Sequence, residues 1–205
     1  MNPISSTPDN AQAAPKLRDA TVHDGSDLAI LADAATRRLV SWLWDESASD
    51  GQSNFEIGRT TILANQSSPS YLANWAVAEV EGRVAGALNS YRLAPADRSV
   101  SGRSAQVVRP LFELKSRAEG TWYISVASVH PEFRQRGIGQ ALISLAERKA
   151  RDANAEAMTL MVGSFNQSAL RLYLRLGFRE VQRRPFRSFP GSDQHGDWIL
   201  MIRDL

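Results

Sequence analysis

The hydrophobic period changes within one continuous stretch of the chain, and this change limits the possible folds. TWYISVASVH (121–130) is rich in β-branched and aromatic residues, which is typical of a buried strand, and Pro131 ends it. From Gly137 to about Asn154 the apolar residues recur with a period of 3.6, as in an amphipathic helix. A strand that leads this directly into a helix predicts a sheet with helices packed on its faces.

The connecting sequence RQRGIGQ (134–140) has two interpretations. Gly137 and Gly139 open the helix, whose first N–H groups are unpaired and carry partial positive charge, so they suit a phosphate. A plain turn before a buried helix explains the same glycines equally well. A P-loop needs Gly-Lys-Ser/Thr, which is missing, and a dinucleotide fingerprint needs a third glycine where Leu142 stands. These residues alone leave phosphate binding open.

The remaining elements follow from local patterns. We expect a first strand in KLRDAT and a helix over 23–44, with Asp24 or Ser26 as N-cap. A second helix is expected over 54–64, and a hairpin turns at Glu81-Gly82. The polar stretch 94–119 reads as a long loop containing a short helix near 111–115. A strand (EAMTLMVG), a helix (NQSALRLYLRLG) and two strands (FREVQRRPF and DWILMIRDL) then complete an α/β or α+β domain over 16–205.

Composition excludes several functional classes. The 205 residues carry a formal charge of only +2, so bulk charge gives no reason to expect a nucleic-acid partner. No cysteine is present for disulfide or thiolate chemistry, and no apolar run is long enough to cross a bilayer. Residues 1–15 have no signal-peptide pattern and are expected to be a disordered leader. We therefore expect a cytoplasmic protein without a membrane partner.

A second motif changes the interpretation of RQRGIGQ. SVASVHPEFRQRGIGQALI resembles motif A of the GNAT superfamily of N-acetyltransferases, in which a strand ending in AVxPxxR leads to an Arg/Gln-x-x-Gly-x-Gly/Ala turn. NQSALRLYLRLGF (166–178) resembles motif B of the same superfamily, and the two motifs occur in the family's order. The resemblance implies a mixed, mostly antiparallel sheet of six to seven strands flanked by helices. It also implies a splay between the motif A strand and the next strand.

The resemblance further implies a site for acetyl-CoA, used as the acetyl donor, and no metal. The pyrophosphate would lie on the backbone of Gln135–Gln140, the pantetheine arm would follow Ala127–Val129, and the Val129 N–H would face the acetyl carbonyl. Asn166 would contact the pantetheine arm and Tyr173 the sulfur. The full set of cofactor-binding candidates is Ala127, Ser128, Val129, Arg134, Gln135, Arg136, Gly137, Ile138, Gly139, Gln140, Ala141, Asn166, Ala169 and Tyr173.

The implied reaction is direct attack of a primary amine on the thioester. Tyr173 is the candidate acid for the departing thiolate, with core packing as the alternative, and Asn166 can also serve as a helix cap. Many relatives carry an acidic base on the motif A strand, but Ser125 and Val126 stand there in this sequence. Glu113 is therefore the candidate base.

The sequence also offers other base candidates and other functions. Glu79, Glu132, His130 and His195 are weaker candidates for roles in the site. One rival function is a non-catalytic acyl-CoA-binding regulatory module. Another is a basic binding protein that uses Arg183, Arg184 and Arg187. The acceptor, a small-molecule or peptide amine, cannot be identified from the sequence, and a homodimer is left open.

Overall fold

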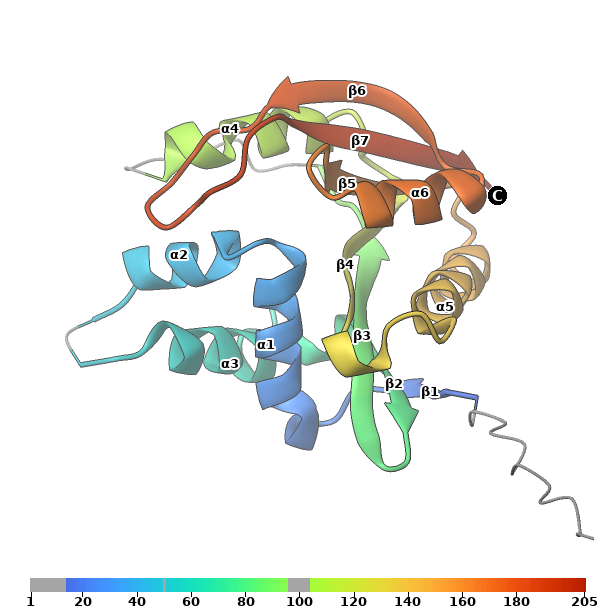
Figure 1. Ribbon diagram of the computed structural model, residues 1–205, viewed down its shortest axis with the longest axis horizontal. Helices are drawn as coiled ribbons and strands as arrows, with labels where there is room; N and C mark the ends of the chain where they lie inside the picture. Colours follow the sequence, from blue (N-terminus) through green and yellow to red (C-terminus); the bar gives the residue numbers. More distant parts are fainter. Residues whose placement is uncertain (1–13, 50, 96–103) are drawn as a thin grey trace, which may run out of the picture.

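A computed structural model of the chain describes residues 14–49, 51–95 and 104–205. The expected leader falls largely on residues 1–13, which lie outside this described part. The described chain forms one twisted sheet with helices on both of its faces (Figure 1). The prediction of a mixed, mostly antiparallel sheet flanked by helices is therefore confirmed.

The sheet has seven strands in the order β1-β2-β3-β4-β5-β7-β6. All neighbours are antiparallel except β4 and β5, which are parallel. The strands are β1 (Lys16–Asp19), β2 (Trp75–Val80), β3 (Arg83–Arg92), β4 (Trp122–Val129), β5 (Ala157–Gly163), β6 (Arg179–Pro185) and β7 (Asp197–Asp204). The β2–β3 hairpin turns at Glu81 and Gly82, whose φ angles of 51° and 75° match the left-handed pair of a type I′ turn.

Helices on opposite faces bury alternate residues of the central strands. Ala87 in β3 packs with residues of α1 (Gly25–Ala35), whereas Leu88 packs with residues of α5 (Ile138–Asp152). Helices α2 (Leu39–Glu46) and α3 (Asn54–Ala64) pack beside α1, and α4 (Ala105–Lys115) packs on β6 and β7. α6 (Gln167–Arg175) precedes β6, and three short 3-10 helices, Val22–Asp24, Leu72–Asn74 and Pro131–Phe133, complete the described elements.

The helix expected over 23–44 is divided into two. Arg37 and Arg38 both have left-handed backbone conformations, with φ angles of 53° and 69°, and they turn the chain between α1 and α2. The apolar period continues through the break, so the pattern predicted one helix where the structure has two. α1 begins at Gly25 after Asp24, but the Asp24 carboxylate accepts a hydrogen bond from the Thr21 N–H at 2.7 Å and does not cap α1.

The helix expected near 111–115 is longer and begins at Ala105. Pro110 and the polar outer face of this segment masked its helical pattern. Val108 and Leu114 are buried by packing on the sheet, and this tertiary contact stabilises the helix.

The β4–β5 pair separates after three residues. Trp122, Tyr123 and Ile124 pair with Met158, Thr159 and Leu160, and beyond this point neither strand has a partner on that side. β4 and β3 also change register between Asn89 and Ser90, so Ser125 is the extra residue of a β-bulge. The predicted splay is therefore present, and the bulge lies where it begins.

Candidate functional site

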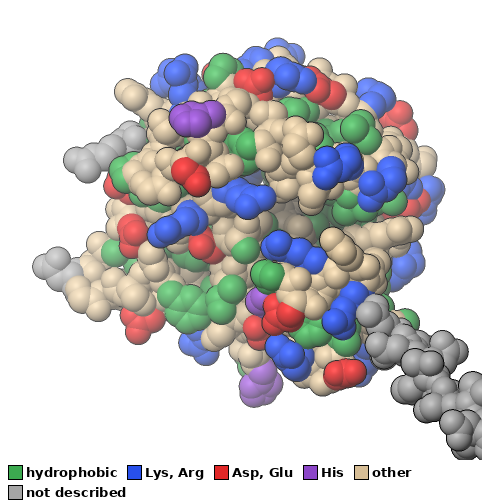
Figure 2. Space-filling model, in the orientation of Figure 1, with side chains coloured by type: hydrophobic (Ala, Val, Ile, Leu, Met, Phe, Trp, Pro, Cys, Tyr) green, Lys and Arg blue, Asp and Glu red, His purple; other side chains and the backbone are tan. Residues whose placement is uncertain are grey.

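The splay opens into a groove of about 510 Å³ between β4, β5, the start of α5, and α6. Figure 2 shows Lys and Arg side chains around the hollowed middle of this face. The groove brings together most of the candidate residues from both motifs. Those that line it are Ala127, Ser128, Val129, Arg134, Gln135, Gly137, Ile138, Gly139, Gln140, Asn166, Ala169 and Tyr173; Arg136, Ala141 and Glu113 do not.

The turn before α5 exposes backbone N–H groups to the groove. Gln135 and Gly137 have φ angles of 62° and 74°, and α5 begins at Ile138. The first hydrogen bond at this end runs from the Ala141 N–H to the Gly137 carbonyl at 3.0 Å. The N–H groups of Ile138, Gly139 and Gln140 precede it and remain free for an anion.

The two arginines of the turn have different surroundings. The Arg134 Nε–H donates a hydrogen bond to the Val129 carbonyl at 3.2 Å, which holds this side chain beside the end of β4. Arg136 lies over the ring of Phe133 at 5.6 Å and is outside the groove lining. The structure therefore places one of the two expected cations, Arg134, against the groove.

One side chain of α6 reaches the glycine-rich turn. A Cβ atom added to Gly139 would lie 3.4 Å from Leu172 Cδ2, so the Leu172 side chain lies beside the first turn of α5. Gly137 has open space around it and needs glycine for its positive φ instead. Of the two, only Gly137 therefore needs glycine for its backbone conformation.

The unpaired edge of β4 forms the long wall of the groove. Ala127, Ser128 and Val129 pair with β3 on one side only, so alternate N–H and C=O groups on the other side face the splay. An extended ligand with amide groups can bind such an edge as an added strand.

Asn166 and Tyr173 reach the groove from α6. The Asn166 Oδ1 accepts a hydrogen bond from the Ala169 N–H at 3.4 Å, so this residue caps the helix and also lines the groove. Tyr173 is 8% exposed and makes an edge-to-face contact with Phe178, at 5.8 Å between ring centroids. Burial raises the pKa of Tyr173 to about 12. Its phenol therefore stays protonated, and can donate a hydrogen bond, throughout the neutral range.

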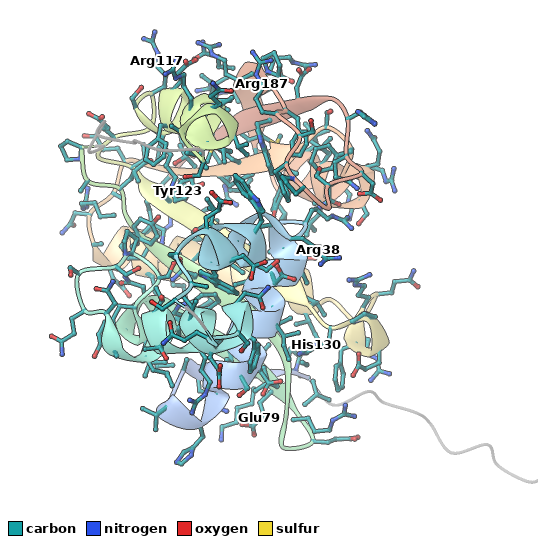
Figure 3. All side chains as sticks on the ribbon, turned by 90° about the vertical axis from the view of Figure 1, so that its left-hand side faces the viewer. Arg38, Glu79, Arg117, Tyr123, His130 and Arg187 are labelled. Carbon is teal, nitrogen blue, oxygen red and sulfur yellow. The ribbon has the colours of Figure 1, made fainter. Side chains whose placement is uncertain are left out.

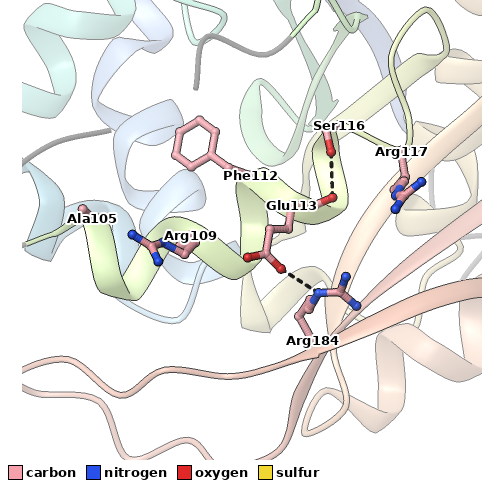
Figure 4. A pocket seen from close by; sticks show the side chains of 7 residues that line it. All are labelled: Ala105, Arg109, Phe112, Glu113, Ser116, Arg117 and Arg184. Atoms are coloured by element: carbon pink, nitrogen blue, oxygen red, sulfur yellow. Dashed lines mark hydrogen bonds and ion pairs between the residues drawn. The ribbon is translucent and has the colours of Figure 1, made fainter. Parts of the chain in front are cut away.

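Glu113 lies elsewhere. It belongs to α4, and its Oε2 accepts a hydrogen bond from Arg184 Nε at 2.7 Å (Figure 4). This pair lines a separate cavity of about 520 Å³ together with Arg109, Phe112 and Arg117. The structure does not bring Glu113 together with Tyr173 among the groove residues.

The other acidic candidates and His130 are also bound away from the groove. Glu79 pairs with Arg18 at 2.9 Å, and Glu132 pairs with Arg83 at 3.2 Å. His130 Nε2 lies 3.7 Å from Asp27 Oδ1. His195, in the β6–β7 connection, is exposed and is not one of the residues that line the groove.

Several residues line the groove that sequence reasoning did not select. Arg37 comes from the α1–α2 turn, Arg175 from the end of α6, and Ser125 from the bulge. Phe165 and Trp198 also line it and contact each other edge to face at 5.7 Å. The helical pattern runs unbroken through Arg37, and nothing local marks Ser125 as a bulge, so neither residue carried a usable signal.

Comparison with known proteins identifies the family. The family model described as "Acetyltransferase (GNAT) family" matches residues 36–178, most of the chain. This protein belongs to the GNAT family of acetyltransferases. An N-acetyltransferase of Methanocaldococcus jannaschii, described as uncharacterized, is 43% identical over 62 residues, which are 28% of this chain. The match spans about a quarter (27%) of that relative's length.

Solved structures share the fold at low sequence identity. An agmatine N-acetyltransferase mutant superposes with a TM-score of 0.67 at 15% identity, covering 94% of this chain and all of that one. A ribosomal-protein-alanine N-acetyltransferase from Brucella melitensis gives a TM-score of 0.61 at 22% identity, covering 93% of this chain and 99% of that one. A putative acetyltransferase from Salmonella typhimurium, solved with its cofactor acetyl-CoA, gives a TM-score of 0.60 at 20% identity, covering 94% of each chain.

In the described part of the chain, no helix combines the length and the apolar character needed to cross a membrane.

Proposed function

We propose that this protein transfers an acetyl group from acetyl-CoA to a primary amine, and that the β4–β5 groove is where it does so. One observation carries the proposal. The unpaired edge of β4, the glycine turn before α5, and Tyr173 of α6 all line a single groove. An edge strand, an anion-binding turn and a protonated phenol, taken together, suit an acyl-CoA thioester.

Acetyl-CoA would lie along the groove with its phosphates at the turn before α5 and its thioester at the start of the splay. Its pyrophosphate would accept hydrogen bonds from the free N–H groups of Ile138, Gly139 and Gln140, with Arg134 adding charge. The pantetheine amides would pair with the edge at Ala127–Val129. The thioester would then point toward the start of the splay, near Ser125.

The transfer needs no covalent enzyme intermediate. The neutral amine attacks the carbonyl carbon, which forms the C–N bond and places negative charge on the carbonyl oxygen. A free backbone N–H of the β4 edge beside Ser125 would stabilise that charge, because Val129, the residue expected from the family resemblance, lies four residues away at the phosphate end of the edge. Collapse of this intermediate breaks the C–S bond and releases the CoA thiolate.

Tyr173 would stabilise the departing thiolate. A thiol pKa is about 8.5, which lies below the pKa of about 12 for this phenol. Tyr173 therefore acts first as a hydrogen-bond donor to sulfur. The ammonium formed by the attack loses one proton, which reaches the thiolate directly or through the Tyr173 phenol. The products are therefore the acetamide and CoA thiol, and Tyr173 ends the turnover protonated.

The amine must arrive neutral or lose its proton to water. Glu113 remains the sequence-based candidate for a base, but its ion pair with Arg184 outside the groove gives it no contact with the site. We therefore propose that solvent, and not Glu113, takes the proton.

The test is to screen a panel of amines for acetyl-CoA-dependent release of CoA thiol, alongside calorimetric titration with acetyl-CoA. Release with at least one amine, with the acetylated product found by mass spectrometry, is the expected result. Tight acetyl-CoA binding without release for any amine would favour the non-catalytic binding module instead.

A further inference from the structure

Three arginines line the groove, and no Asp or Glu is among the described residues that do so. Arg134 is part of the turn before α5, at the phosphate end, and Arg175 is the last residue of α6, three residues after Leu172. The third, Arg37, comes from a different element, the turn between α1 and α2.

Arg37 lies toward the opposite end, where β4 and β5 separate. α1 runs antiparallel to β4 (Figure 1), and Asp27 near its start lies 3.7 Å from His130, just beyond the end of β4. The eight residues from Asp27 to Ala35 advance about 12 Å, which is the length of about four strand residues. This brings the end of α1 level with Val126, beside the bulge.

The side-chain view agrees with this placement. Figure 3 shows Arg38, the neighbour of Arg37, at a height between Tyr123 at the start of β4 and His130 beyond its end. Val126 also packs in the same cluster as α1 residues Leu28 and Ala32. The α1–α2 turn is therefore beside the middle of β4.

The backbone holds Arg37 in an unfavourable conformation. Two successive non-glycine residues in the left-handed region cost free energy, and such strain persists only where the surroundings fix it. The Arg38 N–H donates to the Asp33 carbonyl at 3.1 Å, and the Leu39 N–H donates to the Thr36 carbonyl at 3.2 Å. The guanidinium of Arg37 forms no ion pair or hydrogen bond with any described residue, so it is available to a ligand.

The charge distribution of acetyl-CoA leaves Arg37 without a partner on that molecule. All of its phosphates lie at the nucleotide end, while the pantetheine arm and the thioester are uncharged. An anion for Arg37 must therefore come from the acceptor. We propose that Arg37 binds a carboxylate of the acceptor, and that the acceptor is an amine carrying a nearby carboxylate, such as an amino acid or a short acidic peptide. This inference rests on the proposed transferase function.

The positive charge of Arg37 would also assist the attack of the acceptor amine on the thioester. A guanidinium close to the amine disfavours its protonated form, which raises the fraction of neutral nucleophile. A groove with three arginines also repels acceptors that carry additional positive charge. Arg37 would thus select the acceptor and increase its reactivity at once.

The experiment compares matched acceptors in wild type and two variants. The acceptors are free amino acids and their carboxamides, and peptides Met-Glu-Ala and Met-Gln-Ala as carboxamides. An amino acid amide has the less basic amine, so amine basicity alone would favour it over the acid. Arg37→Gln removes the charge, and Arg38→Gln is the control because it changes the adjacent left-handed residue, which lies outside the groove lining.

Wild type should prefer the carboxylate member of a pair by about tenfold or more in kcat/KM, as expected for a hydrogen bond to a charged group. Arg37→Gln should abolish this preference by lowering kcat/KM for the carboxylate member more than for its amide, while Arg38→Gln should keep the preference. The dissociation constant of acetyl-CoA should not change in either variant.

Equal kcat/KM values for the carboxylate acceptor and its amide in wild type would overturn the inference, and so would a carboxylate preference that survives in Arg37→Gln. Either result would leave the transferase function intact. The free amino acid and peptide arms identify which source supplies the carboxylate. Acetyl-CoA binding with no thiol release for any amine would overturn the transferase function and this inference together.

Discussion

Replacing Asp24 by Asn should destabilise the fold by a calculable amount. Asp24 lies at the start of α1 and is 5% exposed; its two carboxylate oxygens accept hydrogen bonds from Arg18 at 2.8 and 2.9 Å. These bonds lower the pKa of Asp24 from 3.8 to about 2; hydrogen bonds from Thr21 add to the effect and burial opposes it. At about 1.4 kcal/mol per pKa unit, this lowering of the pKa corresponds to about 2 kcal/mol of folding free energy at neutral pH.

The sign of the pH dependence follows from the lowered pKa. The ionised carboxylate stabilises the folded state fully above pH of about 4, and this contribution is lost as pH falls toward 2. Asp24→Asn should therefore lower the free energy of unfolding by about 2 kcal/mol at pH 7 and by about half of that at pH 3. A drop of this size corresponds to about 4 to 8 °C in Tm.

Urea denaturation of wild type and variant at pH 7 and pH 3 measures this effect. Asp19→Asn is the matched control because Asp19 also pairs with a cation, Lys149, at 2.8 Å, but its side chain is 82% exposed. Such a surface pair should contribute less than about 1 kcal/mol. Equal unfolding free energies for wild type and Asp24→Asn at pH 7, or a difference that grows on acidification, would refute the reasoning.

Three further predictions concern the reaction. Tyr173→Phe should lower kcat by about 10- to 100-fold, because it removes a hydrogen bond to a developing thiolate, while acetyl-CoA affinity stays within about threefold. Steady-state kinetics measures this, and an unchanged kcat would make Tyr173 a structural residue. Because the pKa of Tyr173 is about 12, wild-type kcat should show no decline from its deprotonation up to about pH 10. Glu113→Gln should leave kcat within about twofold, because Glu113 pairs with Arg184 outside the groove; a loss of tenfold or more would restore Glu113 as the base.

The cofactor side of the site was largely predictable because its signals are local. The glycines at 137 and 139, the strand before them and the spacing of Asn166 and Tyr173 each describe one short segment. The family resemblance then fixed the order of these segments. Twelve of the fourteen cofactor-binding candidates line one groove; Arg136 and Ala141 do not. That these residues bind acetyl-CoA remains a prediction.

The acceptor side was not predictable because tertiary contacts decide it. Arg37 faces the groove only because two left-handed residues break a helix whose apolar pattern is continuous. Ser125 reaches the groove through a bulge between β3 and β4 that no local pattern marks. Glu113 looked suitable by its position before β4, but α4 packs on β6 and directs it to Arg184.

Calorimetric titration of wild type, Gly137→Glu and Gly82→Glu with acetyl-CoA tests whether the groove binds acetyl-CoA. Both glycines have φ near 75° with open space around them, so both substitutions carry similar backbone strain, but only Gly137 lines the groove. We expect one site per chain in wild type and Gly82→Glu, and no measurable binding in Gly137→Glu because the carboxylate repels the pyrophosphate. Unchanged affinity in Gly137→Glu would contradict the placement of acetyl-CoA in the groove.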